Sequence, residues 1–291
     1  MFVKALKIAE KYTHPVVLSK RFENGKVECG CATFIILNQE GWILTSAHVF
    51  DEWNLFTEHK NEREAYEKQV KAIEANVKLT AKQIRNQIGK LRKNHNWISH
   101  YSFLWAGTNA TVNNIIYDRL ADIAVGKLEP FDKSIIDVYP TFGDPNTELP
   151  QGTSLCRLGF PFHAINATFD AAADSFSLAD DVFPMPRFPN DGILTRHIKI
   201  LDETTKREVS FIETSTPGLR GQSGGPVFDV TGKIWGLQSR TNHLPMGFIV
   251  KVPQGKTFIE EHQFLHVGLA TSTKTITDFL TTHGISFDVA T

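Results

Sequence analysis

The amino-acid sequence predicts a mainly β protein, built as a sandwich or a barrel, from three observations. The chain has 291 residues, of which 41% are hydrophobic and 22% are charged, so it can bury a large core without metal or disulfide support. Short runs of β-branched and aromatic residues alternate with turn clusters that contain glycine, asparagine or proline. For most of the chain no helical pattern separates these runs, as it would in a parallel sheet.

The first expected element is a short amphipathic helix over residues 1–13. Phe2, Leu6, Ala9 and Tyr12 recur there at helical spacing. Charged residues interrupt every apolar run that could serve as a secretory signal, so we expect a cytoplasmic protein.

Charge and cysteine usage narrow the classes of function. Lys and Arg sum to 31 and Asp and Glu to 32, a net charge of −1, so no overall field favours nucleic acid or an anionic membrane. The apolar runs are too short to span a bilayer. Only three cysteines occur, at Cys29, Cys31 and Cys156, which favours reduced thiols. We favour buried strand thiols over a metal site at Cys29 and Cys31, because no second pair of ligands lies nearby, and we expect no cofactor.

Strand patterns occupy most of the remaining chain. They lie at residues 16–18, 31–37, 42–44, 115–128, 154–160, 198–212, 227–230 and 233–238. Thr231 and Gly232 are expected to form a hairpin turn between the last two. Residues 174–191 contain three prolines and are expected to be a long surface loop. A final helix is expected over residues 273–282, with Gly284 as its stop.

One segment departs from the β pattern. Residues 58–94 contain no proline, and apolar residues follow a heptad rhythm with two polar substitutions at Thr80 and Gln87. This rhythm predicts one helix of about 35 residues, roughly 50 Å long, which must pack outside a compact barrel or project from it. We therefore expect a helical insertion at about residues 55–95, either as a solvated helix or as an arm that docks a regulatory protein or a second copy of the chain.

The string Gly221-Gln222-Ser223-Gly224-Gly225-Pro226 carries the strongest chemical signal. Glycines around a serine allow a tight turn whose free N–H groups can face a developing negative charge. Such a serine is a nucleophile only beside a base.

A base and an acid precede this serine in the chain. His48 follows an apolar strand in Thr45-Ser46-Ala47-His48-Val49, although a lone histidine is more often a surface or core residue. Asp122 lies within the apolar string 120–125, where an unpaired charge would be costly. A hydrogen bond to His48 would resolve that cost; otherwise Asp122 would be a turn residue.

These motifs, in the order His, Asp, Ser, resemble the trypsin-like serine peptidases, and most closely the bacterial, disulfide-free HtrA-type protease domain. The resemblance covers about residues 14–285 without the helical segment. It implies an all-β fold of two antiparallel six-stranded β-barrels of the chymotrypsin type, with the site between them. The first barrel would span residues 14–145, the second 146–270, and a C-terminal helix and tail 271–291.

The resemblance also implies roles for particular residues. Ser223 would be the nucleophile, His48 the general acid and base, and Asp122 the orienting acid. The N–H groups of Gly221 and Ser223 would form the oxyanion hole. Substrate would contact Pro217, Ser239, Arg240 and Thr241.

Two residues depart from the family pattern. Gln222 stands where secreted zymogens carry an aspartate, so activation by cleavage is not expected. Pro217 stands where trypsin has an aspartate, so nothing supports a preference for Lys or Arg, and a small or apolar substrate side chain is expected.

The sequence thus predicts a serine endopeptidase that acts through an acyl-enzyme on Ser223 and is regulated through its helical insertion. Two alternatives stay open. One is a catalytically silent protease fold that serves as a binding scaffold. The other is an α/β-hydrolase esterase, because the serine string also fits Gly-x-Ser-x-Gly; Asp229 and His243, His262 or His266 would then complete its triad.

Overall fold

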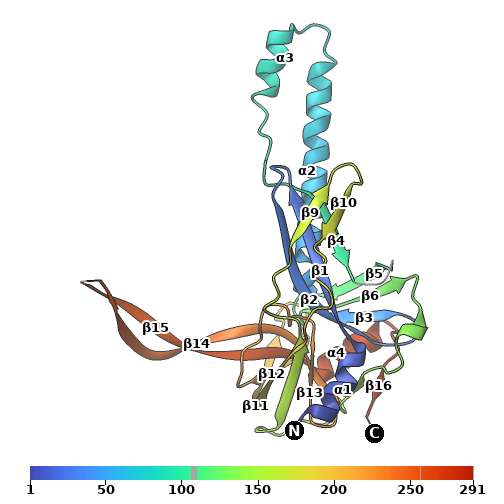
Figure 1. Cartoon of the computed structure of the whole chain (residues 1–291), viewed down its shortest axis with the longest axis vertical. Helices are drawn as coiled ribbons and strands as arrows, with labels where there is room; N and C mark the ends of the chain where they lie inside the picture. Colours follow the sequence, from blue (N-terminus) through green and yellow to red (C-terminus); the bar gives the residue numbers. More distant parts are fainter. Residues whose placement is uncertain (106–109, 256, 291) are drawn as a thin grey trace.

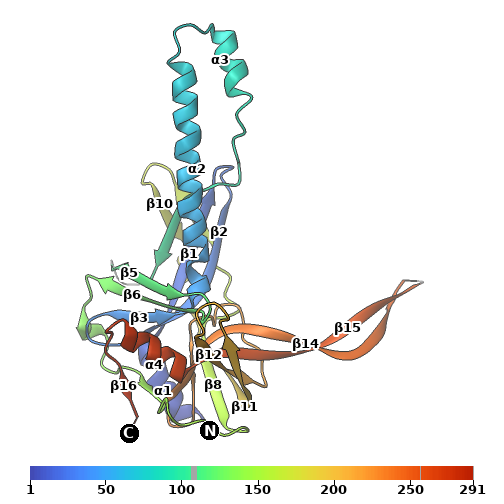
Figure 2. The same cartoon turned by 180° about the vertical axis from the view of Figure 1, so that it is seen from behind.

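The computed structural model describes residues 1–105, 110–255 and 257–290, and it is built around two mainly antiparallel sheets with two long projections (Figure 1). One projection is helical and rises from the first sheet. The other is a β-hairpin that leaves the second sheet in a different direction, as the reverse view also shows (Figure 2).

The first sheet has six strands in the order β4-β1-β2-β3-β6-β5. They are β1 (Thr13–Phe22), β2 (Val27–Ile36), β3 (Trp42–Thr45), β4 (Ile98–Leu104), β5 (Thr111–Asp118) and β6 (Ile123–Glu129). All neighbours pair antiparallel. Within the described residues the edge strands β4 and β5 do not pair with each other.

The second sheet contains a closed ring of six antiparallel strands, because β13 pairs with both β8 and β14. The ring is formed by β8 (Ser154–Gly159), β11 (Phe188–Leu201), β12 (Glu208–Thr214), β15 (Thr257–Ser272), β14 (Ile234–Gln254) and β13 (Pro226–Phe228). Short strands β7 (Thr141–Phe142) and β16 (Asp288–Val289) extend it in parallel pairing, and β9 (Ala167–Asp170) with β10 (Ser175–Leu178) forms a separate hairpin. The expected all-β, chymotrypsin-type fold is confirmed.

The core explains why a continuous apolar run in β2 forms a strand. Phe34 and Ile36 are buried in a cluster formed by strands of the first sheet and by the segments that contain Val49 and Ile136. Ile35 and Leu37 are buried in a larger cluster that also contains residues of the second sheet, such as Phe228. Alternate side chains of a strand point to opposite faces, so β2 is covered on both sides. The two sheets therefore share one core, and the turns that end their strands can meet.

The terminal helices form as expected. Helix α1 (Val3–Tyr12) buries Ala5, Ala9 and Tyr12 against this shared core. Helix α4 (Thr273–Thr282) has the predicted bounds, and the Ser272 side chain caps its first turn by accepting a hydrogen bond from the N–H of Thr275.

The helical insertion exists, but the prediction of one continuous helix of about 35 residues is wrong. Helix α2 (Asp51–Glu74) projects from the body, and the shorter α3 (Ala81–Ile88) folds back beside it (Figure 1). Thr80 and Gln83 form a capping box, in which each side chain accepts the other residue's N–H. The polar residue that interrupted the heptads is therefore the start of a new helix. None of the helices in the described ranges is long and apolar enough to span a membrane.

Several predicted boundaries also need refinement. Residues 115–128 contain parts of β5 and β6, and residues 198–212 contain parts of β11 and β12, so each stretch is a hairpin of two strands. The predicted loop at residues 174–191 contains β10 and the start of β11. Strands β14 and β15 continue far beyond residue 238 as a long paired hairpin, although its outer residues are mostly exposed.

Candidate active site

His48 lies directly after β3, in a 3-10 turn, η1 (Ala47–Phe50). The hydroxyl of the preceding Ser46 is buried and donates to the carbonyl oxygen of Gln238 at 2.8 Å, which ties this turn to the second sheet. The Nδ1 atom of His48 lies 2.9 Å from Oδ2 and 3.1 Å from Oδ1 of Asp122. The backbone N–H of His48 also donates to Oδ1, at 3.0 Å. One carboxylate thus holds both the ring and the backbone of this histidine.

Asp122 occupies the tight turn between β5 and β6. Its φ is +53°, a left-handed conformation that aspartate tolerates better than most residues. The carboxylate of Asp118 accepts the N–H groups of Leu120 and Ala121 and so fixes the same turn. The hydroxyl of Ser239, on β14, donates to Oδ2 of Asp122 at 2.5 Å. Asp122 as a whole residue is 8% exposed, and its contacts with His48 and with Ser239 place its carboxylate at the boundary of the two sheets.

The pair is electrostatically coupled. Burial by itself would raise the pKa of Asp122, but the hydrogen bonds from His48 and Ser239 outweigh burial and hold that pKa below its ordinary value. Burial would lower the pKa of His48, but the hydrogen bond to Asp122 and its negative charge raise that pKa above the ordinary value. Asp122 therefore stays ionised at neutral pH and favours the protonated form of His48.

Ser223 follows a turn of defined type. The N–H of Gln222 donates to the carbonyl oxygen of Leu219 at 2.9 Å, which closes a four-residue turn with Gly221 in its third position. The φ of Gly221 is +94°, as a type II turn requires. A type I turn would need a negative φ there and would reverse the central peptide unit. Within the described residues, the N–H groups of Gly221 and Ser223 donate to no protein acceptor.

Close packing explains why this string needs glycine. A Cβ on Gly221 would collide with the carbonyl oxygen of Phe160, and a Cβ on Gly224, whose φ is +80°, would collide with the carbonyl oxygen of Thr33. The carbonyl oxygen of Gly221 accepts hydrogen bonds from the Thr33 hydroxyl at 2.6 Å and from the Phe160 N–H at 3.1 Å. The carbonyl oxygen of Ser223 accepts the Thr33 N–H at 2.9 Å. Strand β2 of the first sheet thereby holds the serine turn in place.

The side chain of Gln222 braces the same turn from behind. It is fully buried, its Oε1 accepts the N–H of Leu219 at 3.0 Å, and its Nε2 donates to the carbonyl oxygen of Phe188 at 3.2 Å. The neutral amide of Gln222 thus holds the turn by hydrogen bonds, without an ion pair.

The four residues predicted to contact substrate lie together with the serine. Pro217, Ser239, Arg240, Thr241 and Ser223 all line one cavity of about 440 Å³. The turn before Ser223 forms one wall, and β14 with β15 forms the other.

A second cavity, of about 330 Å³, contains His48 and Asp122 and shares Ser239 and Arg240 with the first. The shared walls make the two cavities parts of one cleft. No hydrogen bond joins the hydroxyl of Ser223 to the His48 ring within the described structure. Such contacts are often long without substrate and shorten in the reacting complex.

Sequence reasoning missed several residues of this cleft, among them Arg220 in the turn before Ser223. Gln238 lines it one position before Ser239, so the strand pattern offered a signal. His243 and His266 also line it, and their Nδ1 atoms lie 2.6 Å apart. They are 23 positions apart in the chain, and only the pairing of β14 with β15 brings them together.

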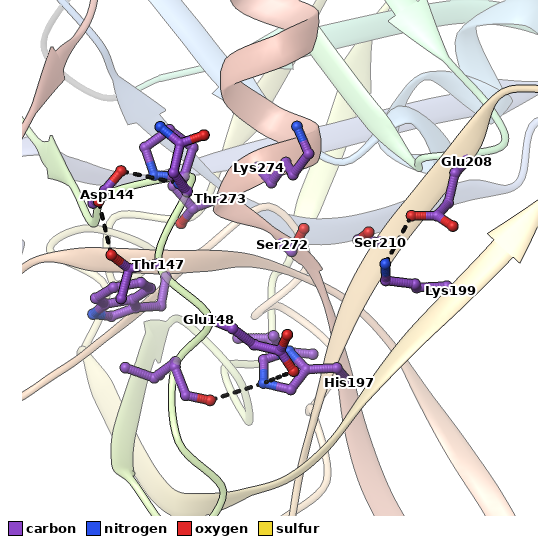
Figure 3. Close-up of a pocket in the computed structure, with 15 residues that line it drawn as sticks. Asp144, Thr147, Glu148, His197, Lys199, Glu208, Ser210, Ser272, Thr273 and Lys274 are labelled. Carbon is purple, nitrogen blue, oxygen red and sulfur yellow. Dashed lines mark hydrogen bonds and ion pairs between the residues drawn. The ribbon is translucent and has the colours of Figure 1, made fainter.

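Another pocket, of about 310 Å³, lies between residues 144–149, strands β11 and β12, and the start of α4 (Figure 3). Its charged groups are largely satisfied by one another. Lys199 pairs with Glu208 at 3.1 Å, and Nε2 of His197 lies 2.8 Å from the carbonyl oxygen of Leu149. Ser272 there caps α4. No predicted catalytic residue lines this pocket, so the cleft beside Ser223 is the candidate active site.

Comparison with known proteins agrees with this geometry. A family model described as the trypsin-like peptidase domain matches residues 32–237, a stretch that contains His48, Asp122 and Ser223. No curated protein matches the sequence significantly.

The solved structures that are similar to this chain include two proteases. The active form of the Rv3671c protease from M. tuberculosis is 12% identical with a TM-score of 0.48, over 98% of this chain and 86% of that one. The HtrA-type protease AlgW with a tripeptide is 15% identical with a TM-score of 0.48, over 98% of this chain and 65% of that one. Because the family model covers more than half of the sequence, the chain belongs to the trypsin-like peptidase family and is a trypsin-like serine protease.

Proposed function

We propose that this protease is an endopeptidase that hydrolyses peptide bonds through an acyl-enzyme on Ser223. The observation that supports this most directly is the convergence of three parts at one cleft. These are the His48–Asp122 hydrogen bonds, the Ser223 residue in the adjoining cavity, and the N–H groups of Gly221 and Ser223, which donate to no acceptor among the described residues.

In the proposed reaction, Oγ of Ser223 attacks the carbonyl carbon of the scissile peptide while Nε2 of His48 takes the hydroxyl proton. Asp122 accepts the hydrogen bond from Nδ1, so the ring keeps the tautomer whose Nε2 is free to act as base. His48 then returns the proton to the leaving amine. Water, activated by the same ring, hydrolyses the ester and frees Ser223.

The turn that contains Gly221 supplies the oxyanion hole in this proposal. As a type II turn, it leaves the N–H groups of Gly221 and Ser223 without acceptors in the part of the chain that the structure describes. Donors that are already oriented lose little free energy to reorganisation when the oxyanion forms. We therefore expect activity without a rearrangement of this turn.

The esterase alternative lacks an assembled triad among the described residues, because no hydrogen bond there joins Asp229 to His243, His262 or His266. Asp229 accepts hydrogen bonds from the N–H of Thr231 and from Nε1 of Trp235 within its own turn. His243 and His266 contact each other. The silent-scaffold alternative predicts the same fold without reaction at Ser223, so the labelling experiment separates it from an active enzyme.

The test is covalent labelling by a fluorophosphonate probe, followed by cleavage profiling on a peptide library. We expect the wild-type chain to be labelled and to cut peptides, and the Ser223→Ala variant to do neither. Ser210→Ala, at the pocket of Figure 3, is the matched control and should react like the wild type. A folded wild-type chain that neither reacts with the probe nor cuts any peptide would favour the scaffold.

We further propose that the α2–α3 insertion regulates this activity by docking a regulatory protein or a second copy of the chain. Helix α2 begins three residues after His48, and its first residue, Asp51, pairs with Arg119 at 2.5 Å beside the Asp122 turn. Further along α2, Glu62 accepts the indole N–H of Trp97 at 2.7 Å. The base of α2 is thus attached to the first sheet close to the site, whereas α2 and α3 bury no residue of their own.

A deletion can separate the base of this insertion from its outer part. Replacing residues 69–91 by a short Gly-Ser linker keeps the anchored turns of α2. We expect the sheets to stay folded while assembly state or activation changes. If assembly state, activation and substrate choice all equal those of the full chain, the insertion has no regulatory role.

We also propose a cytoplasmic location, since all three cysteines are free thiols. Burial raises the pKa of the Cys31 thiol to about 12, which makes it unreactive at neutral pH. Cell fractionation with thiol labelling before lysis tests the proposal, and recovery outside the cytoplasm would contradict it.

A further inference from the structure

The cavity beside Ser223 has an uneven charge. Its ionisable wall residues are Arg220 from the serine turn, Arg240 and His243 from β14, and His266 from β15. No Asp or Glu belongs to that wall among the described residues. The cavity, about 440 Å³, is large enough to take a long side chain of a bound peptide.

A buried cation lies behind the base of this cavity. Arg157 on β8 is 2% exposed, and its guanidinium donates to the carbonyl oxygens of Thr216 at 2.8 Å and Pro217 at 2.6 Å. It also donates to the hydroxyl of Thr214, and its Nε has no hydrogen-bond partner. No carboxylate of the described residues forms an ion pair with it. Burial lowers the pKa of Arg157 to about 10, so the group stays charged at neutral pH.

The carbonyl groups of the lining residues Pro217 and Gly218, and that of Thr216 just before them in the chain, already have donors. The Thr216 oxygen accepts from the N–H of Gly268, the Pro217 oxygen from Nδ2 of Asn190, and the Gly218 oxygen from the hydroxyl of Thr241. A lysine or arginine side chain of a substrate would therefore find few free acceptors here. It would also meet Arg220 and Arg240 on the wall, with Arg157 behind the carbonyl group of Pro217.

These charges favour the opposite kind of substrate. A buried cation without a counter-ion is costly, and an anion brought close to it recovers part of that cost. Exclusion of water by a bound peptide strengthens the attraction. The sequence expectation of a small or apolar side chain rested on Pro217 alone. In the structure the carbonyl oxygen of Pro217 accepts a hydrogen bond from the guanidinium of Arg157 on β8.

We propose that this cavity takes an acidic side chain, Asp or Glu, from the residue whose carbonyl carbon Ser223 attacks. The inference rests on the proposed function and names its substrate class. One neutral acceptor, Oε1 of Gln238, lies on the wall without a hydrogen-bond partner. The cavity could therefore instead favour a glutamine side chain, whose amide would donate to this oxygen. Comparing peptides with Glu and with Gln at this position distinguishes the two preferences.

The experiment measures kcat/KM on four peptides that differ only at that residue, which is Glu, Gln, Val or Lys. We expect kcat/KM for the Glu peptide to exceed that for the Gln peptide by about tenfold, because a charge-assisted hydrogen bond exceeds a neutral one by about 1.4 kcal/mol. We expect the Lys peptide to have the lowest kcat/KM. Equal rates for Glu and Gln, or a preference for Val or Lys, would overturn the inference while leaving the endopeptidase intact. Absence of any Ser223-dependent cleavage or labelling would instead overturn the proposed function, and this inference with it.

Variants of the cleft residues then test whether their positive charges cause the preference for Glu. Arg157→Gln removes the buried cation and should bring the Glu-to-Gln ratio near one. Because a change at this buried site can prevent folding, Arg220→Gln combined with His266→Gln tests the exposed wall, and this variant should lower the ratio several-fold. Lys199→Gln, at the distant pocket of Figure 3, is the matched loss of a positive charge and should leave the ratio unchanged. A ratio that stays at the wild-type value in both cleft variants contradicts the proposal.

Discussion

The two halves of the candidate site are held in different ways. On the first sheet, the carboxylate of Asp122 holds His48 by hydrogen bonds to its ring and its backbone N–H, and Ser239 contacts the same carboxylate from β14. On the second sheet, Ser223 is positioned by backbone hydrogen bonds and by glycines that no other residue can replace without a collision. The first half therefore depends on ionisation, whereas the second depends on backbone shape.

This difference predicts two kinds of failure. Changes to the His48–Asp122 half should alter how activity depends on pH, because they act on the pKa of the base. Changes to the Ser223 turn should lower the rate at every pH, because they act on oxyanion stabilisation. Each half should show only its own signature.

The largest effect is expected for Asp122→Asn. The amide keeps the shape but loses the charge that raises the pKa of His48, and it favours the wrong tautomer of the ring. We expect kcat to fall about 10⁴-fold. Steady-state kinetics at saturating peptide measure this, with Asp144→Asn, an exposed turn carboxylate, as the control. A loss below about tenfold would mean that Asp122 does not orient His48.

A smaller loss is expected for Gly221→Ala. The added Cβ would collide with the carbonyl oxygen of Phe160, and the φ of +94° would be strained. Rotation of the turn would remove one oxyanion donor, so we expect kcat to fall about 10²- to 10³-fold with an unchanged pH profile. Gly152→Ala is the matched control, because its φ is +85° and its Cβ would meet nothing within 4 Å. Equal losses of kcat in the two variants would mean that backbone strain alone, and not a lost oxyanion donor, lowers the rate.

The two halves also differ in how far the sequence could predict them. His48, Asp122 and Ser223 each stand in a short string that combines an apolar strand with a tight turn, so local patterns identify them. The fold followed from the same strands. Gln222 was noted only as a departure from the family, and nothing local indicated that its amide would brace the turn.

Contacts between distant segments explain what the sequence could not show. Arg157 reaches the cavity base across 60 positions of chain, and His243 meets His266 only because two long strands pair. In the insertion, the heptad count treated Thr80 as a tolerated polar residue. Its side chain instead accepts the N–H of Gln83 and so starts helix α3. This local hydrogen bond competes with the backbone hydrogen bonds that would continue α2. Periodicity reports which face is apolar, and it does not report where a helix ends.

Gln222→Met tests the brace behind the serine turn. Methionine has a similar length but cannot accept the N–H of Leu219, so the turn should lose definition. We expect kcat to fall about tenfold, KM to change little, and the pH profile to stay the same. Gln87→Met makes the same change on the exposed side of α3 and should be neutral. A displaced pH profile would contradict the separation of the two halves.

The smallest effect concerns pH and completes the comparison. His48 acts as a base only when neutral, and Asp122 holds its pKa above the ordinary value of 6.5. Activity should therefore be lost as pH falls through a midpoint above 6.5. Ser239→Ala removes one hydrogen bond that keeps the pKa of Asp122 low. The carboxylate of Asp122 then keeps its hydrogen bonds to His48. We expect a change of a few-fold in kcat/KM at most, while the acidic midpoint stays above 6.5, because the charge of Asp122 remains. A midpoint at or below 6.5 in the wild-type enzyme would show that the carboxylate does not control the base, and the contrast between the two halves would then fail.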